Sequence, residues 1–492
     1  MEEPTGAPAV SRRWPEVLAI ALAVAIAGDV LLRPWPWGIG AVLWMTLVLA
    51  GLAAATRRAG IRQRDGAWFM ALAAFFAGAL AWRDAGFLRF LNVLALLVTL
   101  GFAVSRNGRV ATAQAGVADL AGDLLRSGWA AASGCFSLLS DEAGRDLRRR
   151  ATVLAGLRGL ALAIPLLVVF GAVLVSADPV FSALVLGSNL PRAASHLLVV
   201  MLLAWGGAGA LREALSGRPW ILPAAVTARR PWLGAVEFGV ILGLLDALFL
   251  AFVVVQFRYL FGGASLIAVV PHLTYAQYAR RGFFELVAAV ALTLGVLLLA
   301  HWLLRPGDRA AGRVYRALAG AMVGLVMVIV GSGFYRMGIY FAHFGLTPAR
   351  LYATVFMAGL AATLVWFSAT ALRGRRASFA IGGLVAGLAV VVLLNFLNPD
   401  HLVTRVNVAR SVAGHPVDAW HLMSLSADAV PGLVASLDAL PERYRPMVAA
   451  RLLGWWGRGA QPDWRTWNWG RAAARRVVQV NREALSRLAQ DH

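Results

Sequence analysis

Two acidic residues, Glu237 and Asp246, interrupt an otherwise apolar stretch that runs from about residue 233 to 256. Asp246 lies ten or more residues from either end of it. An ionisable group at the centre of a membrane helix costs roughly 2.5–3.5 kcal/mol on insertion scales, so it is a functional candidate. One interpretation is a proton or cation relay, and the other is a hydrogen-bonded acid that joins helices. At about 100° per residue, the nine-residue spacing places the two acids on opposite faces, so they cannot pair.

A second group of polar residues lies at the ends of four neighbouring apolar stretches. Six of the eight tyrosines belong to this group, which runs from residue 259 to 352 and also contains arginines. An aromatic belt with snorkelling arginines explains part of this pattern. Guanidinium and phenol groups together also suit carboxylates or phosphates, so we expect an outward-facing rim that binds an anionic ligand or a lipid head group. The candidate rim residues are Arg258, Tyr259, Tyr275, Tyr278, Arg280, Arg281, Glu285, Arg336, Tyr340 and His343.

Helical spacing arranges some of these rim residues. Arg281 and Glu285 lie four positions apart, so they share a face and can pair. Arg336, Tyr340 and His343 follow one another at i, i+4 and i+7, which again defines one face if the helix continues that far.

The composition places these residues in a membrane. Of 492 residues, 60% are apolar and 14% are charged, with a mean hydropathy of +0.69. Soluble domains carry about 25% charged residues, so an ordinary soluble enzyme is excluded. All 46 basic residues are arginine, which is typical of a GC-rich bacterial genome, and the net charge is +21. Because the arginines lie mainly between apolar runs, we predict no nucleic-acid partner, and contact with the bilayer and its anionic head groups instead.

Eleven stretches are long and apolar enough to cross a bilayer, which needs about 20 residues per helix. Backbone groups in lipid must be paired internally, so we predict an all-α, polytopic transmembrane bundle. The first stretch could instead be a cleaved signal peptide, although its apolar run continues to Leu32 and favours a retained helix. The predicted spans lie near 17–32, 38–56, 67–82, 86–104, 153–177, 193–211, 233–256, 282–303, 317–335, 351–371 and 378–397.

Arginine placement predicts the orientation. If the amino terminus is cytoplasmic, the segments on that side hold 24 arginines and the opposite loops hold 9. By the positive-inside rule, this protein is expected in the bacterial cytoplasmic (inner) membrane with its amino terminus inside. Eleven spans then place the carboxyl-terminal segment outside.

The chain is predicted to have four regions. They are a four-span region (1–104), a cytoplasmic amphipathic and basic linker (105–150), a seven-span core (151–397) and an extracytoplasmic helical tail (398–492). The linker contains a polar helix-like segment, Ala111–Leu125. In the tail, helices are expected after Asp418, from Pro441 to about Gly457, and from about Arg471 to Gln490. Its tryptophans suit lipid head groups or envelope sugars.

The sequence offers no catalytic signature. There is one cysteine, Cys135, so an intramolecular disulfide is excluded. The eight histidines lack metal-ligand spacing, and no nucleophile elbow, zinc-protease or dinucleotide motif is present. We therefore predict no catalytic residues, no metal and no cofactor. An intramembrane enzyme with Glu285 or His343 as base has no catalytic spacing to support it.

Four segments resemble a known family. The first two are Arg258–Gly263 and Thr274–Leu286, the third is the pair of short motifs Asn398-Pro-Asp400 and Arg405-Val-Asn407, and the fourth is Leu425–Pro431. Over roughly residues 150–440 the chain resembles the bacterial membrane proteins filed as domain of unknown function 4173. The family name carries no activity, so the resemblance implies architecture and a shared signature at the rim. Together the observations predict a membrane protein of unassigned activity, a small-molecule or ion transporter; the alternative is an extracytoplasmic ligand sensor or envelope-interaction protein that uses the rim and the tail.

Overall fold

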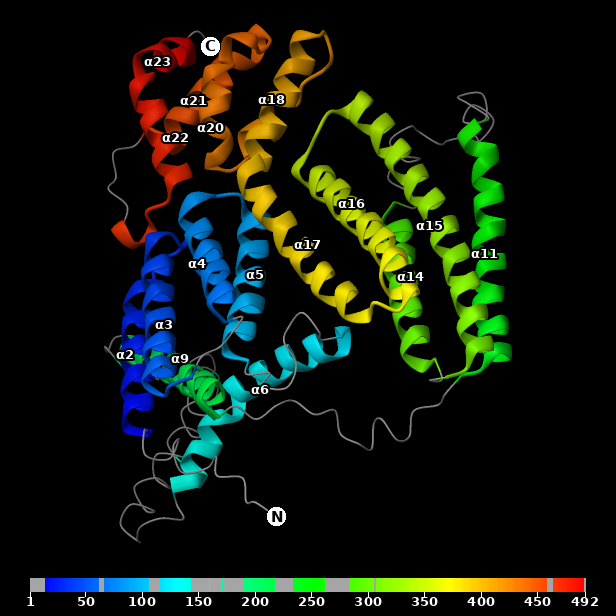
Figure 1. Ribbon diagram of the computed structural model, residues 1–492. Helices are drawn as coiled ribbons and strands as arrows, with labels where there is room; N and C mark the ends of the chain where they lie inside the picture. Colours follow the sequence, from blue (N-terminus) through cyan, green and yellow to red (C-terminus); the bar gives the residue numbers. More distant parts are fainter. Residues whose placement is uncertain are drawn as a thin grey trace. The chain divides into compact units, whose positions relative to one another are not determined.

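The computed structural model describes residues 14–61, 66–105, 116–142, 190–216, 233–261, 283–304, 307–457 and 463–490, with the single positions 159, 170 and 173. Within these ranges the backbone is helical almost throughout, and its one extended pairing is an isolated bridge between Leu233 and Leu304. The protein is a polytopic helical membrane bundle whose carboxyl-terminal segment is also helical (Figure 1).

Ten apolar helices coincide with predicted spans. Eight are long enough to cross a bilayer by length and composition. The other two are α4 (Gly66–Trp82) and α14 (Phe283–Leu303), whose apolar stretch from Ala288 to Leu303 is shorter. The fifth predicted span, near 153–177, lies outside the described residues except for the single positions 159, 170 and 173. The eight long helices are α2 (Trp14–Leu32), α3 (Ile39–Arg58), α5 (Gly86–Val104), α9 (Leu190–Ser216), α11 (Ala235–Phe261), α15 (Arg309–Phe344), α16 (Pro348–Ala369) and α17 (Arg376–Leu397).

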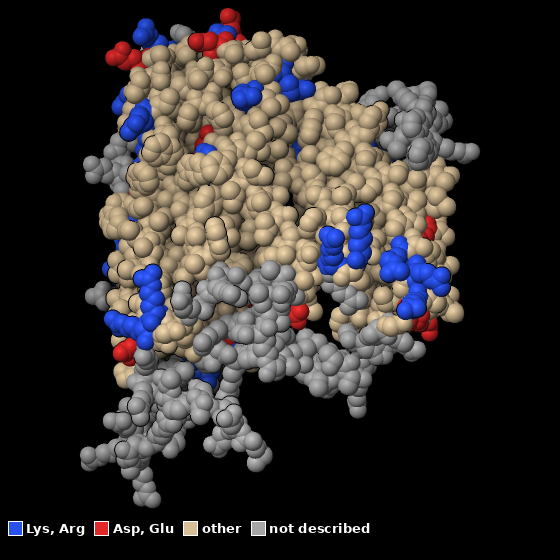
Figure 2. Space-filling model, viewed as in Figure 1, with Lys and Arg blue, Asp and Glu red and all other residues tan. Residues whose placement is uncertain are grey.

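The chain divides into two compact units. The first comprises residues 1–112, 118–220 and 459–472, and the second comprises 113–117, 221–458 and 473–492. On the face shown in Figure 2, the long helices carry little charge over most of their length, and charged side chains gather near helix ends. This is the distribution expected of helices whose middle parts contact hydrocarbon.

In the first unit, α2 packs against α3 and α9, α3 against α4, and α4 against α5. Small side chains at Ala21 and Ala25 are buried, and a Cβ at Gly207 of α9 would lie 3.8 Å from Ala21, so α2 and α9 approach closely. Phe69 of α4 stacks on Phe102 of α5 with ring centroids 5.0 Å apart. Small residues at such contacts are typical of membrane helices.

The amphipathic helix α6 (Val117–Glu142) lies in the predicted linker and packs against the first unit. Arg126 forms a 2.8 Å ion pair with Glu213 of α9, and the Ser127 hydroxyl donates to the Gly101 carbonyl of α5. A Cβ at Gly209 would lie 2.4 Å from the carbonyl oxygen of Ala130, so glycine is required for this close approach. The helix extends well beyond the predicted end at Leu125.

In the second unit, α15 packs along α11 and contacts α14 and α16, and α16 contacts α17. Tyr315 is fully buried in the apolar core of this unit, where its hydroxyl donates to the Leu297 carbonyl at 3.0 Å and its ring packs against Phe238. With 36 residues at about 1.5 Å each, α15 is about 54 Å long, so it extends beyond the ~30 Å hydrocarbon core. The 3₁₀ turn η2 (Ala371–Arg373) joins α16 to α17.

The tail of the second unit has its own apolar core, which includes Val403, Leu422, Leu433 and Val448. Of the predicted tail helices, α19 begins after Asp418 and α21 ends before Gly457, as expected. The helix predicted from Pro441 begins as the 3₁₀ turn η5 and becomes α-helical only at Arg445. The third is divided at Asn481 into α22 and α23. The tail elements are α18 (Pro399–Val412), α19 (Ala419–Ser424), η3 (Ala427–Ala429), α20 (Val430–Ala435), η4 (Leu437–Ala439), η5 (Glu442–Tyr444), α21 (Arg445–Trp456), η6 (Trp464–Thr466), α22 (Trp469–Val480) and α23 (Arg482–Gln490); of these, η6 and the start of α22 belong to the first unit.

Candidate functional site

Asp246 lies in the middle of α11, the helix that packs along α15. Both of its carboxylate oxygens are shielded from solvent, and neither has a hydrogen-bond partner among the described residues. Its helical neighbour Leu242 belongs to the apolar core of the second unit, and Leu245 packs against that core. A carboxyl group in such surroundings is costly to keep ionised, so it favours binding a proton or a cation.

Glu237 occupies a different environment on the same helix. It lies in the first turn of α11, its side chain is exposed, and it accepts a hydrogen bond from the Gly234 N–H at 2.9 Å. A carboxylate at a helix amino terminus satisfies a backbone donor and complements the helix dipole. The nine-residue separation from Asp246 corresponds to about 13 Å along the helix axis. Its contact at the start of α11 is therefore sufficient to explain why an acid is present at position 237.

Three predicted rim residues, Arg336, Tyr340 and His343, lie on α15, which continues to Phe344 as their shared face requires. Tyr340 is buried, with its ring under the guanidinium group of Arg350 at 3.9 Å. His343 is exposed, and its Nδ1 lies 3.0 Å from the Ile339 carbonyl oxygen. The structure thus brings one rim tyrosine together with an arginine that the rim prediction did not include.

The side chains of the other seven rim candidates lie outside the description. Tyr275, Tyr278, Arg280 and Arg281 lie outside the described residues. Three more lie in helices, but their side chains are outside the description: Arg258 and Tyr259 in α11, and Glu285 in α14.

A polar clamp joins the α15–α16 turn to α18. Asn407 accepts a hydrogen bond from the Leu346 N–H at 2.9 Å and donates to the Leu346 carbonyl at 2.7 Å. Arg350 donates to the carbonyls of Phe344 and Gly345. Gly345 has a φ of 72°, a backbone conformation that favours glycine. A Cβ there would also lie 2.4 Å from the Asn407 Oδ1, so a larger residue would clash with the clamp. Spacing alone missed this contact because 61 residues separate its partners.

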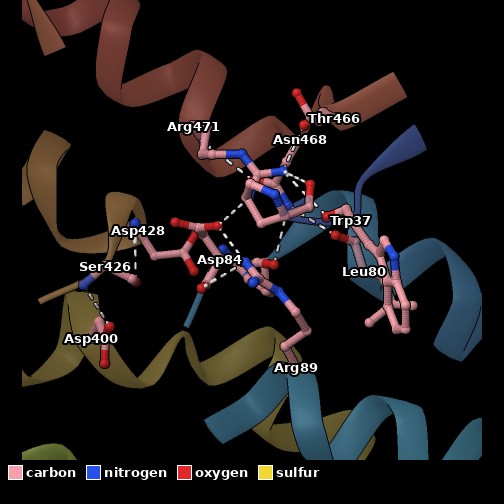
Figure 3. A network of polar contacts seen from close by, with 12 residues as sticks. Trp37, Leu80, Asp84, Arg89, Asp400, Ser426, Asp428, Thr466, Asn468 and Arg471 are labelled. Carbon is pink, nitrogen blue, oxygen red and sulfur yellow. Dashed lines mark hydrogen bonds and ion pairs between the residues drawn. The ribbon is translucent and has the colours of Figure 1, made fainter. Parts of the chain in front are cut away.

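The closing segments quoted for the family resemblance also make defined contacts. Asn398, with a φ of 53°, caps α18, and Asp400 accepts from the Ser426 N–H at 3.0 Å. The Ser426 hydroxyl accepts in turn from the Asp428 N–H, and both contacts are drawn in Figure 3. These residues join α18 to the η3 turn, so their evident role is to hold the tail together.

Figure 3 also shows a charged network within the first unit, centred on Asp84 between α4 and α5. Its carboxylate lies 2.5 Å from a guanidinium nitrogen of Arg89 and 2.5 Å from one of Arg471. Arg471 also donates to the carbonyl of Thr466 at 2.6 Å and to that of Trp37 at 3.2 Å. Both terminal nitrogens of Arg471 donate to acceptors of the chain, so the network fastens residues 463–472 to the ends of the first helices.

A second pairing in this unit involves Asp29 near the end of α2. Asp29 accepts from Arg33 at 2.8 Å, as its four-residue spacing predicts, and it also contacts His196 of α9. The histidine contact links two helices and could not be read from local spacing.

The tail also carries an open groove of about 380 Å³ between α19 and α21. Trp420 and Trp455, which are 67% and 53% exposed, line it together with Arg451, whose guanidinium group lies 3.7 Å from the centre of the Trp455 ring. Exposed aromatic faces beside an arginine suit sugars or the membrane interface. In the part of the chain that the structure describes, no three His, Cys, Asp or Glu side chains are grouped to hold a metal ion.

The fold and these sites define a multi-pass helical membrane protein. The family described as "Domain of unknown function (DUF4153)" matches residues 70–436, which is well over half of the chain. The chain belongs to that family. The match confirms membership of an uncharacterised family but does not support the number 4173 that the quoted segments suggested. No curated protein and no solved structure matches the chain.

Proposed function

We propose that this protein is a transporter that moves protons or a small cation across a bacterial inner membrane, with Asp246 as the ion-binding group. The observation that carries the proposal is the shielded carboxylate of Asp246, without a described partner, in the middle of an apolar helix. If the acid only joined helices, it would be expected to hydrogen-bond to a neighbouring helix.

The proposed orientation follows from the arginine distribution in the sequence. The amino terminus and the α16–α17 turn face the cytoplasm, and the tail faces the outside. To carry a proton, Asp246 would bind it from one side of the membrane and release it to the other. This requires α11 or its neighbours to move so that Asp246 is accessible from each side in turn, as in other ion-coupled membrane proteins.

A flux assay in proteoliposomes tests the proposal. The full chain is reconstituted with a pH-sensitive dye inside, and a potassium-diffusion potential drives protons inward; a parallel assay uses sodium with a sodium-sensitive dye. Wild-type vesicles should carry at least one of these ions well above the rate of empty vesicles. Asp246→Asn, which keeps the size of the side chain, should lose at least 90% of this flux.

Glu237→Gln is the matched control because it changes another acid of α11 whose side chain is exposed and serves the helix start. Its flux should stay within about a factor of two of wild type. Both variants should elute and melt as the wild type does. Undiminished flux in Asp246→Asn, or wild-type flux no greater than that of empty vesicles, contradicts the proposal.

The groove between Trp420 and Trp455 supports a second candidate function, recognition of a cell-envelope glycan by the tail. Exposed indole rings stack on sugar faces, and Arg451 would bind an acidic substituent. Binding of a soluble peptidoglycan fragment should weaken at least tenfold in the Trp420→Ala/Trp455→Ala double variant. Trp464→Ala, which removes an exposed indole outside this groove, should bind normally. Equal binding by all three proteins would exclude this function.

A further inference from the structure

One face of α18 forms a basic groove of about 450 Å³ that the rim prediction did not include. Its helical residues recur at positions that share a face of an α-helix, and the six lining residues include no acid. They are Arg405, Val406, Ala409, Arg410, Ala413 and His415.

The turn that ends α18 brings the histidine back to the arginines. Gly414 adopts a φ of 85°, and the His415 N–H donates to the Arg410 carbonyl at 3.0 Å, while the Gly414 N–H donates to Ser411. This is the Schellman arrangement, which needs a residue that tolerates the left-handed region. Local backbone hydrogen bonds at the end of α18 therefore place His415 beside Arg410.

Arg410 is the unusual member of the groove. Its Nε and Nη2 are shielded from solvent and have no hydrogen-bond partner among the described residues. The nearby Gly345 carbonyl already accepts from Arg350, another cation. A guanidinium group with unpaired buried donors is unfavourable, so a rotation of this side chain that directs the donors to an anion in the groove would be favourable. We infer that this groove is a binding site for a phosphate group.

The position of the groove favours the phosphodiester of an anionic lipid as its source. Asn407, one turn from Arg410, is hydrogen-bonded to Leu346, and the apolar span of α16 begins at Pro348. A span begins where hydrocarbon gives way to head groups, so α18 crosses the turn at about the level of lipid phosphates. Planar guanidinium groups bind phosphate oxygens through two parallel hydrogen bonds. Inorganic phosphate is the other source with the same chemistry.

The site does not depend on Asp246, and its test measures lipid binding rather than flux. The full-length protein in detergent is titrated with phosphatidylglycerol and, separately, with phosphatidylcholine, and bound lipid is counted by native mass spectrometry. Phosphatidylglycerol should bind at least tenfold more tightly, because the choline group of the second lipid meets the same arginines unfavourably. Equal binding of the two lipids overturns the inference.

Substitutions then locate the site. Arg410→Ala should lower the affinity for phosphatidylglycerol at least tenfold, and Arg405→Ala about threefold. Because Arg405 is exposed, its replacement should leave folding intact even if Arg410→Ala disturbs it. Arg482→Ala removes an exposed arginine from α23 and is the control, with unchanged affinity expected. The groove is not the site if Arg405→Ala binds phosphatidylglycerol as tightly as the Arg482→Ala control does, and Arg410→Ala folds and keeps the wild-type affinity.

A competition step distinguishes the two sources of phosphate. If 10-fold molar excesses of inorganic phosphate over the lipid displace phosphatidylglycerol from wild type, the groove recognises the free anion. If they do not, the lipid is the ligand. Either result supports a phosphate site, provided that the Arg405 and Arg410 variants lose the binding.

Discussion

Arg471 shows how one side chain can fasten distant parts of a chain. It is 7% exposed and pairs with Asp84 while also donating to carbonyls of two separate turns. Removing it leaves the largely shielded carboxylate of Asp84, whose side chain is 14% exposed, with one partner fewer, and several carbonyls lose this donor. Breaking a buried pair in this way typically costs about 3–5 kcal/mol.

We therefore expect Arg471→Ala to lower the free energy of unfolding by about 3–5 kcal/mol, measured by denaturant titration in detergent. Arg471→Lys should recover little of it, because a single ammonium group cannot reach acceptors on several sides. Arg476→Ala, at an exposed position one turn further along α22, should change stability by less than about 0.5 kcal/mol. An Arg471→Ala protein as stable as the wild type would show that the network is dispensable.

Asp463 gives a prediction about pH at the same scale. Hydrogen bonds from the side chain and backbone of Arg465 hold the pKa of this carboxyl below its ordinary value of 3.8. A lowered pKa means that the pairing stabilises the folded segment above the ordinary value and is lost as the pH falls through the lowered one.

Hydrogen exchange of residues 463–469 should therefore show protection at pH 5 that decreases below pH ~3.8. In Asp463→Asn, protection should already be reduced at pH 5 and should not change further in this window beyond the intrinsic exchange rate. Identical pH profiles for the two proteins would rule out Asp463 as the titrating group.

At the scale of elements, the Asn407 clamp fixes where α18 meets the turn between α15 and α16. Asn407→Ala leaves the N–H and carbonyl of Leu346 without these partners, so we expect a loss of about 1–3 kcal/mol in the free energy of unfolding. Asn407→Asp retains an acceptor for the N–H but has no donor for the carbonyl, so it should not restore stability. A fully stable aspartate variant would mean that the second hydrogen bond contributes nothing.

The sequence predicts elements well where the cause is local or depends on the bilayer. Apolar length located ten described apolar helices, eight of which are long enough to span a membrane, and the capping residue Asp418 and the stop at Gly457 located two tail helices. The break at Asn481 was missed, because the residues around it are compatible with one continuous helix.

Contacts between residues that are far apart in the chain could not be predicted from the sequence. Asp84 and Arg471 are 387 residues apart, and no spacing rule connects them. Asp29 illustrates both cases, since its pairing with Arg33 follows from a four-residue spacing whereas its contact with His196 needs the packing of α2 on α9. The apolar setting of Asp246 was predictable, but the absence of a described partner for its carboxylate was not.

For the whole molecule, the orientation in the membrane determines what the sites can reach. The family match covers residues 70–436, which includes α11 with Asp246 and α18 with the basic groove. If the tail faces outward, the basic groove and the tryptophan groove lie on the envelope side, where lipid phosphates of the outer leaflet and cell-wall glycans are accessible. With the opposite orientation, both would meet cytoplasmic ligands instead.

Cysteine labelling across α17 decides between these orientations. In a Cys135→Ser background, Arg373→Cys and Val480→Cys each introduce a thiol at an exposed position of the second unit. Among the described residues between them, α17 is the one candidate span, so the two thiols should lie on opposite sides if α17 crosses the bilayer. The arginine distribution predicts that an impermeant maleimide labels position 480 in intact cells and position 373 only after lysis. The reverse pattern would invert the orientation and move both grooves to the cytoplasm, and labelling of both positions in intact cells would mean that α17 does not span the membrane.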